Sequence, residues 1–492
     1  MIPLSSAAAR AGSRLAALML VALLVPGCAT LPEVAPAPRN PGAVRLQNAH
    51  GPLSRQQSAA ILDGLKAKTG ETSLLDRHLA VEQEFVDSPI VVGNKVTLLK
   101  DGPATYRAMF AAIHKARDHI NLESYIVEGD ETGRKFSDLL IEKRKQGVKV
   151  RLLYDSVGSI NTPKEFFERL QQAGIETLEF NPVNPLAGGN VADIDHRDHR
   201  KLLIVDGRVA FLGGINISNV YSSGSASFRR SGSARKSEKS DKDSGKDREP
   251  AGNEAGKAAD PNKSAWRDTH VQVEGPVVAE YQKLFLATWN GQKGEMPDDA
   301  RFFPHLEEAG KDIVHAIGSS ADASYNQNYV TLVSAINSAE TYIYLTNAYF
   351  VPDPQLLGAI KDAARRGVDV RIILPSHTDF WAVFHAGRSH YTELLEADVR
   401  IYERQGSLLH SKTALIDGVW SCVGSTNLDW RSFVHNNEID AVVLGDAFAA
   451  QLRAMFEDDL KESRAIDLAQ WKRRSLGLRM KEWSARLWDY WL

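Results

Sequence analysis

Hydrophobic and polar positions follow the same order in two halves of the chain. In each half the apolar spacing predicts a helix, a strand, a second helix and a second strand. These elements span 104–116, 120–127, 136–144 and 148–154 in the first half, and 329–339, 342–348, 356–365 and 368–374 in the second. Gly147 and Gly367 end the second helix of each set. Because strands that alternate with helices form layered units, we expect two α/β units.

Each half then continues with two short apolar runs that predict a β-hairpin. The runs cover 202–205 and 209–212 in the first half, and 413–416 and 419–423 in the second. Gly207 and Gly418 lie between the paired runs, where a tight turn is expected.

A polar motif of the form H-x-K-x4-D leads into each hairpin. Its residues are His199, Lys201 and Asp206 in the first copy and, 211 residues later, His410, Lys412 and Asp417 in the second. Asn216 and Asn427 each follow their histidine by 17 residues. Residues two apart on a strand point to the same face, so each hairpin presents an imidazole beside an ammonium group. One constellation that occurs twice in the same register favours one shared function.

The imidazole and ammonium groups together suit a phosphate ester. A lysine donates hydrogen bonds to the non-bridging oxygens, and a histidine attacks phosphorus or transfers a proton. One copy supplies half of a site. Two copies brought together supply a nucleophile, a general acid and two cations, which is enough to split a phosphodiester in two steps.

Two other interpretations of the motif were weighed. A single His-x-Lys pair is usually an exposed polar strand face, but the second copy with the same spacing disfavours this. A metal site is the other alternative, because acids and histidines cluster at Asp193, Asp195, His196, Asp198 and His199. The cluster also contains Arg197, Arg200 and Lys201, which a metal shell seldom tolerates, and the second copy lacks the extra acids. We therefore expect no metal and no other cofactor.

The doubled motif resembles the signature of the phospholipase D superfamily, and more closely that of bacterial cardiolipin synthases. The matching residues are 197–201, 206–207, 213–216 and 266–270 in the first copy, and 410–412, 417–418, 424–433, Asn436 and Glu438 in the second. The resemblance covers about residues 90 to 460. It implies two tandem phospholipase D-like α/β/α sandwich repeats, with the active site at their pseudo-twofold interface.

The resemblance also implies a reaction with a phospholipid substrate. One histidine, usually that of the first motif, attacks the phosphorus of phosphatidylglycerol, and the other protonates the departing glycerol. A second phosphatidylglycerol then receives the phosphatidyl group and gives cardiolipin, whereas water would give phosphatidic acid. Lys201, Lys412, Asn216 and Asn427 would hold the phosphoryl oxygens. Asp206 and Asp417 are expected to pair with basic groups inside the interface.

The polar segment 222–264 separates Asp268 from the first motif. It contains one aromatic residue, cannot bury a core and is expected to be disordered. Without its 43 residues Asp268 would follow His199 by 26 positions, and Glu438 follows His410 by 28. This similarity makes Asp268 and Glu438 equivalent, and in the family such an acid hydrogen-bonds the catalytic imidazole. The repeats are expected to span 89–295 and 312–465.

The N-terminal part predicts export and a membrane anchor. Residues 1–28 have the pattern of a signal peptide, and Cys28 ends a segment that resembles a lipobox, which would make it the acylated residue. A plain signal peptide and an uncleaved anchor are the alternatives. Residues 29–88 predict a proline-rich tether, to about residue 50, followed by short helices. The expected location is the bacterial cell envelope, lipid-anchored and facing the periplasm. Ala29 is typical of outer-membrane sorting, whereas the resemblance to cardiolipin synthases implies the inner membrane, so both membranes stay open.

Composition and charge narrow the function classes further. The net charge of −3 provides no general basic field, so nucleic acid is not an expected partner. A periplasmic nuclease with the same motif and a non-catalytic lipid-binding lipoprotein remain as alternatives. The C-terminal segment 466–492 is basic and rich in tryptophan. It predicts either a helix that lies on an anionic membrane or a helix packed on the body with its tryptophans inward.

Overall fold

The computed structural model describes residues 31–34, 44–69, 73–183, 195–223, 265–296, 300–321, 323 and 325–491. The chain divides into two compact units, Met1–Pro32 and Glu33–Leu492. Every helix and strand of the described residues lies in the second unit. The predictions for the signal segment, for Cys28 and for nearly all of the insert 222–264 lie outside the described residues.

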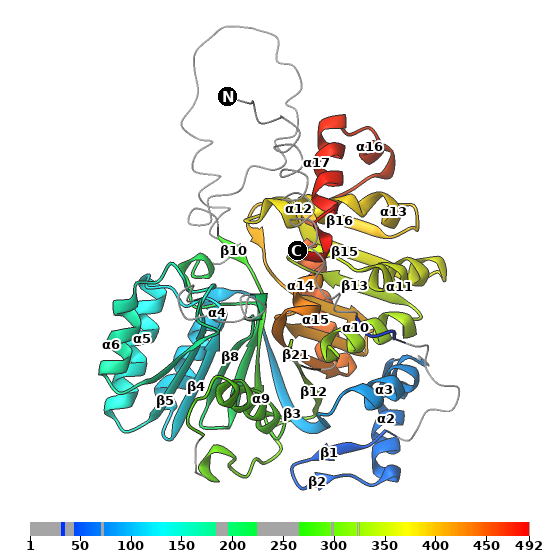
Figure 1. Cartoon of the computed structure of the whole chain (residues 1–492). Helices are drawn as coiled ribbons and strands as arrows, with labels where there is room; N and C mark the ends of the chain where they lie inside the picture. The colour runs from blue at the N-terminus through cyan, green and yellow to red at the C-terminus, as the bar shows by residue number, and fades with distance from the viewer. Residues whose placement is uncertain are drawn as a thin grey trace, which may run out of the picture. The chain divides into compact units, whose positions relative to one another are not determined.

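The first repeat contains a mixed sheet whose neighbours follow the order β6-β5-β4-β8-β9-β11-β3 (Figure 1). Its strands are β3 (Ile90–Leu99), β4 (His119–Ser124), β5 (Lys149–Asp155), β6 (Glu176–Phe180), β8 (Lys201–Val205), β9 (Val209–Gly213) and β11 (His270–Glu274). Its helices are α4 (Gly102–Lys115), α5 (Glu131–Lys145), α6 (Lys164–Gln172) and α9 (Val278–Gly291). β4, β5 and β6 are parallel, and parallel neighbours need crossover connections, which α5 and α6 provide.

The second repeat has the same strand order, β16-β15-β13-β18-β19-β21-β12. Its strands are β12 (Asp312–Ser319), β13 (Tyr342–Thr346), β15 (Asp369–Pro375), β16 (Arg400–Arg404), β18 (Thr413–Ile416), β19 (Trp420–Gly424) and β21 (Asn436–Leu444). Its helices are α10 (Gln327–Ser338), α11 (Pro354–Arg365), α12 (Trp381–Ser389), α13 (Tyr391–Leu395) and α15 (Asp446–Lys461). The predicted order of helices, strands and hairpins is confirmed in both halves, and with it the two α/β repeats.

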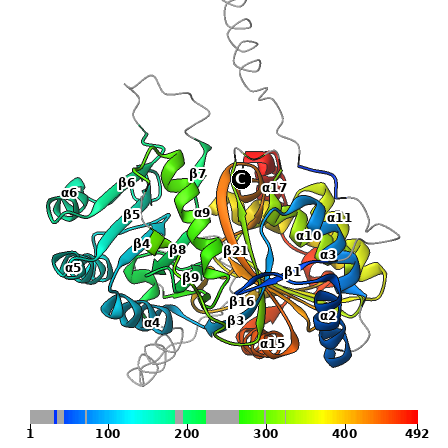
Figure 2. The same cartoon turned by 90° about the horizontal axis from the view of Figure 1, so that it is seen from below.

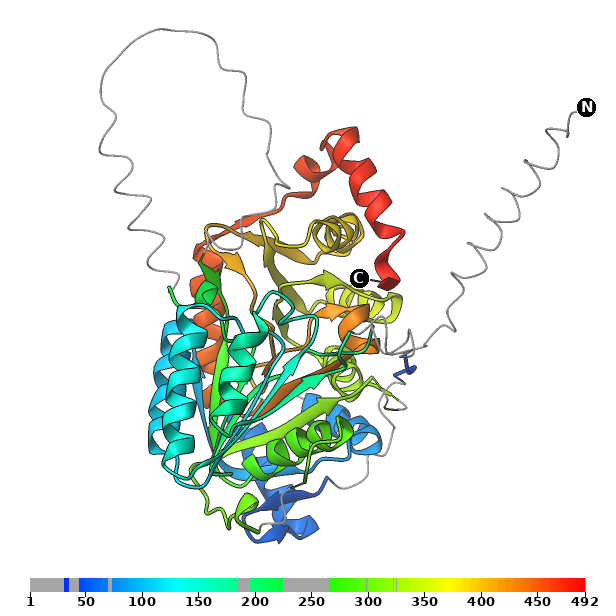
Figure 3. The ribbon, with the colours of Figure 1, turned by 60° about the vertical axis from the view of Figure 1, so that its left-hand side comes forward.

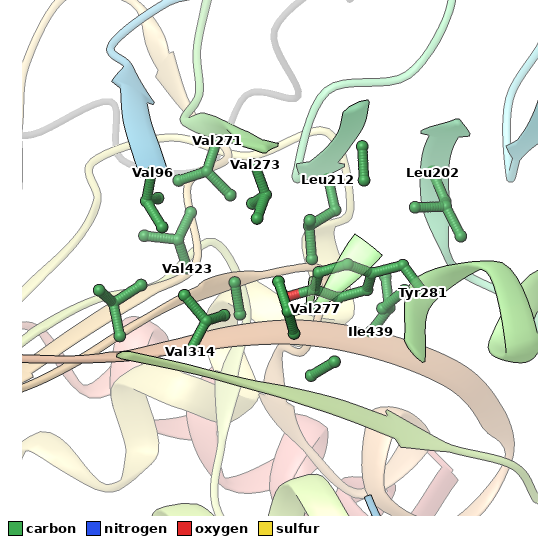
Figure 4. Packing of buried hydrophobic residues seen from close by; sticks show 14 of the residues in the cluster. Val96, Leu202, Leu212, Val271, Val273, Val277, Tyr281, Val314, Val423 and Ile439 are labelled. Atoms are coloured by element: carbon green, nitrogen blue, oxygen red, sulfur yellow. The ribbon is translucent and has the colours of Figure 1, made fainter. Parts of the chain in front are cut away.

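The two repeats pack against each other through their sheets. β3 pairs with β12 in antiparallel fashion, which joins the two sheets at one edge. Buried side chains of both repeats then meet in one core (Figure 4). The labelled members are Val96, Leu202, Leu212, Val271, Val273, Val277 and Tyr281 from the first repeat and Val314, Val423 and Ile439 from the second. In this core β9 of the first repeat contacts β19 and β21 of the second, which fixes the two hairpins opposite one another. Figure 2 labels β9 and β21 where the two repeats meet.

Two short strands of the first repeat pair with strands of the second repeat. β7 (Arg197–Asp198) pairs with β21 of the second repeat, and β10 (Trp266–Arg267) pairs with β17 (Leu408–Leu409). The buried carboxylate of Asp459 adds to this interface, because it binds the guanidinium groups of Arg267 at 2.8 Å and Arg404 at 3.1 Å. The backbone beside each histidine is therefore held by the opposite repeat.

The N-terminal part departs from the predicted tether. β1 (Leu46–Asn48) forms a hairpin with β2 (Gly51–Pro52) and also pairs in parallel with β3. The tether predicted to residue 50 is therefore wrong from Leu46 onward, because that side chain is buried and the edge of β3 offers free backbone groups. Helices α2 (Arg55–Thr69) and α3 (Leu74–Phe85) follow, and α3 packs against α10 of the second repeat.

The remaining elements surround the second repeat and the linkers. They are β14 (Phe350–Val351), β20 (Leu428–Asp429), β22 (Ser463–Ala465), α14 (Trp430–Val434), α16 (Leu468–Lys472), α17 (Leu476–Arg486) and the 3-10 turns η1 (Asn219–Tyr221), η2 (Ala300–Phe302) and η3 (Asp489–Trp491). In the C-terminal segment Trp471 is buried, as predicted for a helix packed on the body. Trp483 and Trp488 are exposed, which fits the other prediction, a helix that lies on a membrane. No described helix is long and apolar enough to span a membrane.

The motif aspartates lie at the turns of the hairpins, away from the histidine ends of β8 and β18. Asp206 accepts hydrogen bonds from the backbone N–H groups of residues 117, 118 and 119 at 2.8–3.2 Å. Asp417 accepts them from residues 340, 341 and 342 at 2.8–2.9 Å. Both have positive φ angles, 54° and 51°, which are uncommon for residues other than glycine. The two aspartates were expected to pair with basic groups in the interface. Instead, each anchors its hairpin turn to the start of a neighbouring strand of the same repeat, β4 for Asp206 and β13 for Asp417.

Replacing Asp206 with alanine is expected to lower the thermal unfolding midpoint by several degrees. The change leaves three amide groups without their acceptor and removes a side chain suited to a positive φ, at a cost of about 1–3 kcal/mol. Asp362→Ala is the matched control, since that exposed carboxylate pairs with surface Arg365. Differential scanning fluorimetry compares the two, and equal midpoints would contradict a turn-anchoring role.

Candidate active site

A cavity of about 320 Å³ lies between the repeats and contains both motif histidines. Its lining comes from both halves of the chain: Tyr125, Ile126, His199, Asn216 and Trp266 from the first, and Tyr349, Asp379, Phe380, Val383, His410, Asn427, Asp429, Arg431 and Asn436 from the second. Tyr125 follows the carboxyl end of β4, and Tyr349 follows that of β13. The cavity thus lies at the carboxyl ends of parallel strands, where α/β sheets commonly bind ligands.

His199 takes its partners from the second repeat. Its Nδ1 lies 3.0 Å from both carboxylate oxygens of Glu438, and its backbone N–H donates to the carbonyl oxygen of Asn437 at 3.0 Å. Glu438 is itself held, because it accepts hydrogen bonds from the Ser425 hydroxyl and from Asn436 Nδ2 at 3.2 Å. A fixed carboxylate on Nδ1 sets the orientation of the imidazole and directs Nε2 away from it.

His410 takes its partners from the first repeat. Its Nδ1 lies 2.7 Å from Asp268 Oδ2, and its backbone N–H donates to the carbonyl oxygen of Arg267 at 2.8 Å. The other carboxylate oxygen of Asp268 accepts from the Thr269 N–H at 2.7 Å. The sequence suggested that Asp268 and Glu438 each orient an imidazole without saying which. The structure crosses them, so that each acid holds the histidine of the opposite repeat.

The glycine or serine beside each acid matches the length of that acid. A Cβ atom on Gly214 would lie 2.1 Å from Asp268 Oδ1, so only glycine fits there. The equivalent residue of the second repeat is Ser425, whose hydroxyl binds the longer Glu438. Each half-site therefore places a carboxylate on the Nδ1 of a histidine. Glycine stands beside the shorter acid, Asp268, and serine beside the longer one, Glu438.

Burial controls the protonation of the site. It lowers the pKa of His199 well below 6.5, and the neighbouring charges of Lys201 and Lys412 lower it further. Burial and Lys412 likewise lower the pKa of His410. Both imidazoles are therefore neutral at pH 7. With Nδ1–H donated to a carboxylate, the lone pair lies on Nε2, which is the form required of a nucleophile or base.

The two motif lysines are buried beside the histidines. Lys201 donates to the carbonyl oxygen of His199, and its Nζ lies 5.2 Å from the centroid of the Tyr125 ring. Lys412 Nζ lies 2.6 Å from the carbonyl oxygen of His410 and 3.1–3.2 Å from its ring nitrogens. Burial lowers the pKa of Lys201 to about 7 and also lowers that of Lys412. A bound anion would favour the positive charge of both lysines.

The two motif asparagines differ in their hydrogen bonds. Asn216 accepts from the Ile126 N–H at 3.0 Å and donates to the Tyr221 hydroxyl at 3.1 Å, so it also fixes the loop after β4. Asn427 lines the cavity with a buried Oδ1 that has no hydrogen-bond partner within the described residues. The asparagine of the second motif therefore has an acceptor left for a hydrogen-bond donor of a ligand.

Comparison with known proteins agrees with this arrangement. The family model described as "Cardiolipin synthase, PLD-like domain" matches residues 109–224 and 332–460. The cardiolipin synthase of Alkalihalophilus pseudofirmus is 34% identical over 426 residues, which cover 86% of this chain and 76% of the relative. That of a Geobacillus species is 35% identical over 402 residues, covering 81% and 73%. The chain belongs to the cardiolipin synthase family of phospholipase D-like proteins.

A solved structure supports the fold of this family member. The phosphatidylserine synthase of Haemophilus influenzae Rd KW20 superposes with a TM-score of 0.61 over 84% of this chain and 99% of its own length, at 12% sequence identity. The two segments matched by the family model contain His199 and His410, whereas Asp268 lies between them. Asp268 and the cavity residue Trp266 thus complete a site whose other lining residues come from the matched segments.

Several cavity residues of this family member were not found from the sequence. Tyr125, Tyr349 and Asp379 were not singled out, and Trp266 and Arg431 were quoted in the motifs without a role. Their position just after parallel strands, or beside a motif residue, was the available signal. Asp193 of the alternative metal cluster lies outside the described residues. Asp198 faces buried Glu123 and Arg200, and no group of three possible ligands occurs in the described part of the chain.

Affinity for a phosphodiester anion is expected to fall as pH rises through about 7. Lys201 loses its charge near that pH, and Glu438 and Asp429, whose pKa values burial raises to about 7, become negative over the same range. All three changes make the cavity less favourable for an anion. Dimethyl phosphate is the suitable probe, because its own charge is constant over this range.

Calorimetric titration of dimethyl phosphate at several pH values measures this dependence. Lys201→Met is the comparison variant: it should bind more weakly below pH 7 and show a flatter profile, since one of the three titrating groups is gone. Affinity that is constant or increases between pH 6 and 8 would contradict the assignment.

Proposed function

We propose that this chain transfers a phosphatidyl group between two molecules of phosphatidylglycerol and forms cardiolipin and glycerol. The observation that carries the proposal is the pair of neutral imidazoles, His199 and His410, which share one cavity and are each fixed through Nδ1 by a carboxylate. The cardiolipin synthase relatives agree with this reaction.

In the first step His199 Nε2 attacks the phosphorus of one phosphatidylglycerol. A P–N bond forms, and the P–O bond to the glycerol head group breaks. The departing glycerol oxygen takes a proton from Nε2 of His410, which is protonated in the complex with the anionic substrate. Lys201, Lys412 and Asn427 donate to the phosphoryl oxygens as negative charge builds up on them.

In the second step the head-group hydroxyl of another phosphatidylglycerol enters. His410, now neutral, removes its proton, the oxygen attacks phosphorus, and the P–N bond breaks. This step restores His199 and regenerates protonated His410. Asp268 stabilises the positive charge of His410 during the cycle, and Glu438 does so for His199.

An alcohol acceptor is favoured over water by the cavity lining. Trp266, Tyr349, Phe380 and Val383 provide an apolar wall that limits access of water to the intermediate. Asp379 accepts a hydrogen bond from the Tyr349 hydroxyl at 2.8 Å and lines the same cavity, so its carboxylate can also accept from glycerol hydroxyls. Hydrolysis to phosphatidic acid is the second candidate, since the same intermediate serves both reactions.

Product analysis distinguishes these reactions. The form that starts at Ala29 is suitable, because the core lies wholly within Glu33–Leu492. Incubated with phosphatidylglycerol vesicles and EDTA, it is expected to yield cardiolipin and free glycerol. Phosphatidic acid alone would replace the transferase with a hydrolase, and no turnover would leave the nuclease and lipid-binding alternatives.

The roles of the two histidines can be separated with phosphatidyl-p-nitrophenol, whose leaving group needs no proton. His410→Ala is expected to release about one equivalent of p-nitrophenolate and then stop, because the intermediate forms but its acceptor is not activated. His199→Ala should release none. The exposed His305 provides a matched control in His305→Ala, which should turn over normally. The opposite pattern would make His410 the nucleophile.

We also propose that the protein works in the bacterial cell envelope, anchored through an acylated Cys28 and facing the periplasm. The support is the N-terminal sequence alone, in which a basic segment, an apolar run and a cysteine follow one another. Cys28→Ser is expected to remove the acyl mass from the N-terminal peptide in mass spectrometry. An unchanged mass would favour a plain signal peptide or an uncleaved anchor.

A further inference from the structure

Helix α17 carries an apolar stripe that faces solvent. Leu476, Met480 and Trp483, with Leu487 just after the helix, are 73%, 70%, 66% and 66% exposed. Their spacing of four, three and four residues places them on one face of a helix. Scattered single apolar residues are normal on a protein surface, but a continuous stripe indicates an interaction site.

The opposite face of α17 is firmly attached to the protein. Ala485 is buried in a small apolar cluster with Val351, Val383 and Ala386. After the helix, Asp489 lies 3.1 Å from His390 Nε2. The outward direction of the stripe is therefore fixed by packing on α12 (Figure 3).

The stripe belongs to the same part of the molecule as the active-site cavity. Val383, which contacts the inner side of α17, also lines the cavity. Phe380 lines the cavity as well and is 49% exposed, and its neighbour Trp381 is 41% exposed. In the first repeat Ile160 follows the end of β5 by five residues, as Phe380 follows β15, and it is 68% exposed. An exposed apolar side chain thus follows the equivalent strand in both repeats, and that of the second repeat, Phe380, lines the cavity.

Exposed lysines and arginines lie in the same C-terminal segment as this stripe, and two of them, Lys472 and Arg486, pair with Glu396 and Glu393. Lys472, Arg473, Arg479, Lys481 and Arg486 of the C-terminal segment are all exposed. Glu482, the one acidic residue of α17, is turned inward and bound to Arg474 at 2.8 Å. An exposed apolar stripe flanked by lysine and arginine is the pattern of a helix that lies in the plane of an anionic bilayer.

We propose that the outer face of α17, together with Phe380 and Trp381, docks on an anionic phospholipid bilayer and holds the mouth of the cavity against the lipid head groups. We name these residues the docking surface. With 11 residues α17 is too short to span a bilayer, so it would lie at the interface. The benefit for catalysis rests on the proposed function, because only a lipid substrate gains from delivery at this surface. The docking itself does not rest on the proposed function.

Vesicle flotation of the form starting at Ala29 tests the docking surface without the lipid anchor. The protein is expected to float with vesicles that contain phosphatidylglycerol and much less with pure phosphatidylcholine. The double variant Trp483→Ser and Leu487→Ser removes two exposed side chains and should reduce binding at least ~10-fold. Phe303→Ser is the matched control, since Phe303 is an exposed aromatic residue beside the turn of the β8–β9 hairpin, away from the histidine end.

Turnover separates this proposal from the proposed function. The double variant should lose activity on vesicles but keep it on a short-chain phosphatidylglycerol that is monomeric in solution. If no form turns over any lipid, the proposed function fails while flotation still decides the docking. Equal flotation of the variant and the wild-type protein would overturn the proposal. A second result would also overturn the proposal. If the wild-type protein binds no vesicles and sediments as a dimer that the double variant loses, the stripe joins two copies of the chain.

Discussion

The site depends on the exchange of carboxylates between the two repeats. His199 is held by Glu438 and His410 by Asp268, and in each case the backbone N–H of the histidine also bonds to the opposite repeat. Separating the repeats would break both imidazole–carboxylate contacts, and each acid would keep only the hydrogen bonds from its own repeat. The interface and the active site are therefore one structure, and neither repeat carries a complete site.

The apolar core behind the site accounts for its electrostatics. The sheets meet through side chains such as Leu212, Val271 and Ile439, which exclude water. The histidines and lysines beside this core are buried as well, and burial disfavours their charged forms. The neutral nucleophile and the lowered pKa values of the two lysines are thus consequences of packing as much as of the motif. Burial of the site also suits a reaction that must exclude water.

Much of the fold was predictable because its signals are local. Apolar periodicity gave the helices, the strands and the hairpins of both repeats, and the doubled motif revealed the two half-sites by its spacing alone. The tether was wrong from Leu46 onward, because pairing of β1 with the distant β3 is not visible in local composition. The exposed stripe of α17 was also undecided, since the same tryptophan-rich sequence fits a packed helix and an interfacial one.

The sequence by itself determined the family, the two-repeat α/β organisation and the positions of the doubled motif. Only the tertiary structure decided that the acids cross between repeats, since the contacts of Asp268 and Glu438 join residues 142 and 239 positions apart. It also showed that Asp206 and Asp417 anchor turns, because the amide groups they bind lie about 80 residues earlier in the chain. Such contacts depend on how the sheets pack, and local spacing contains no record of that packing.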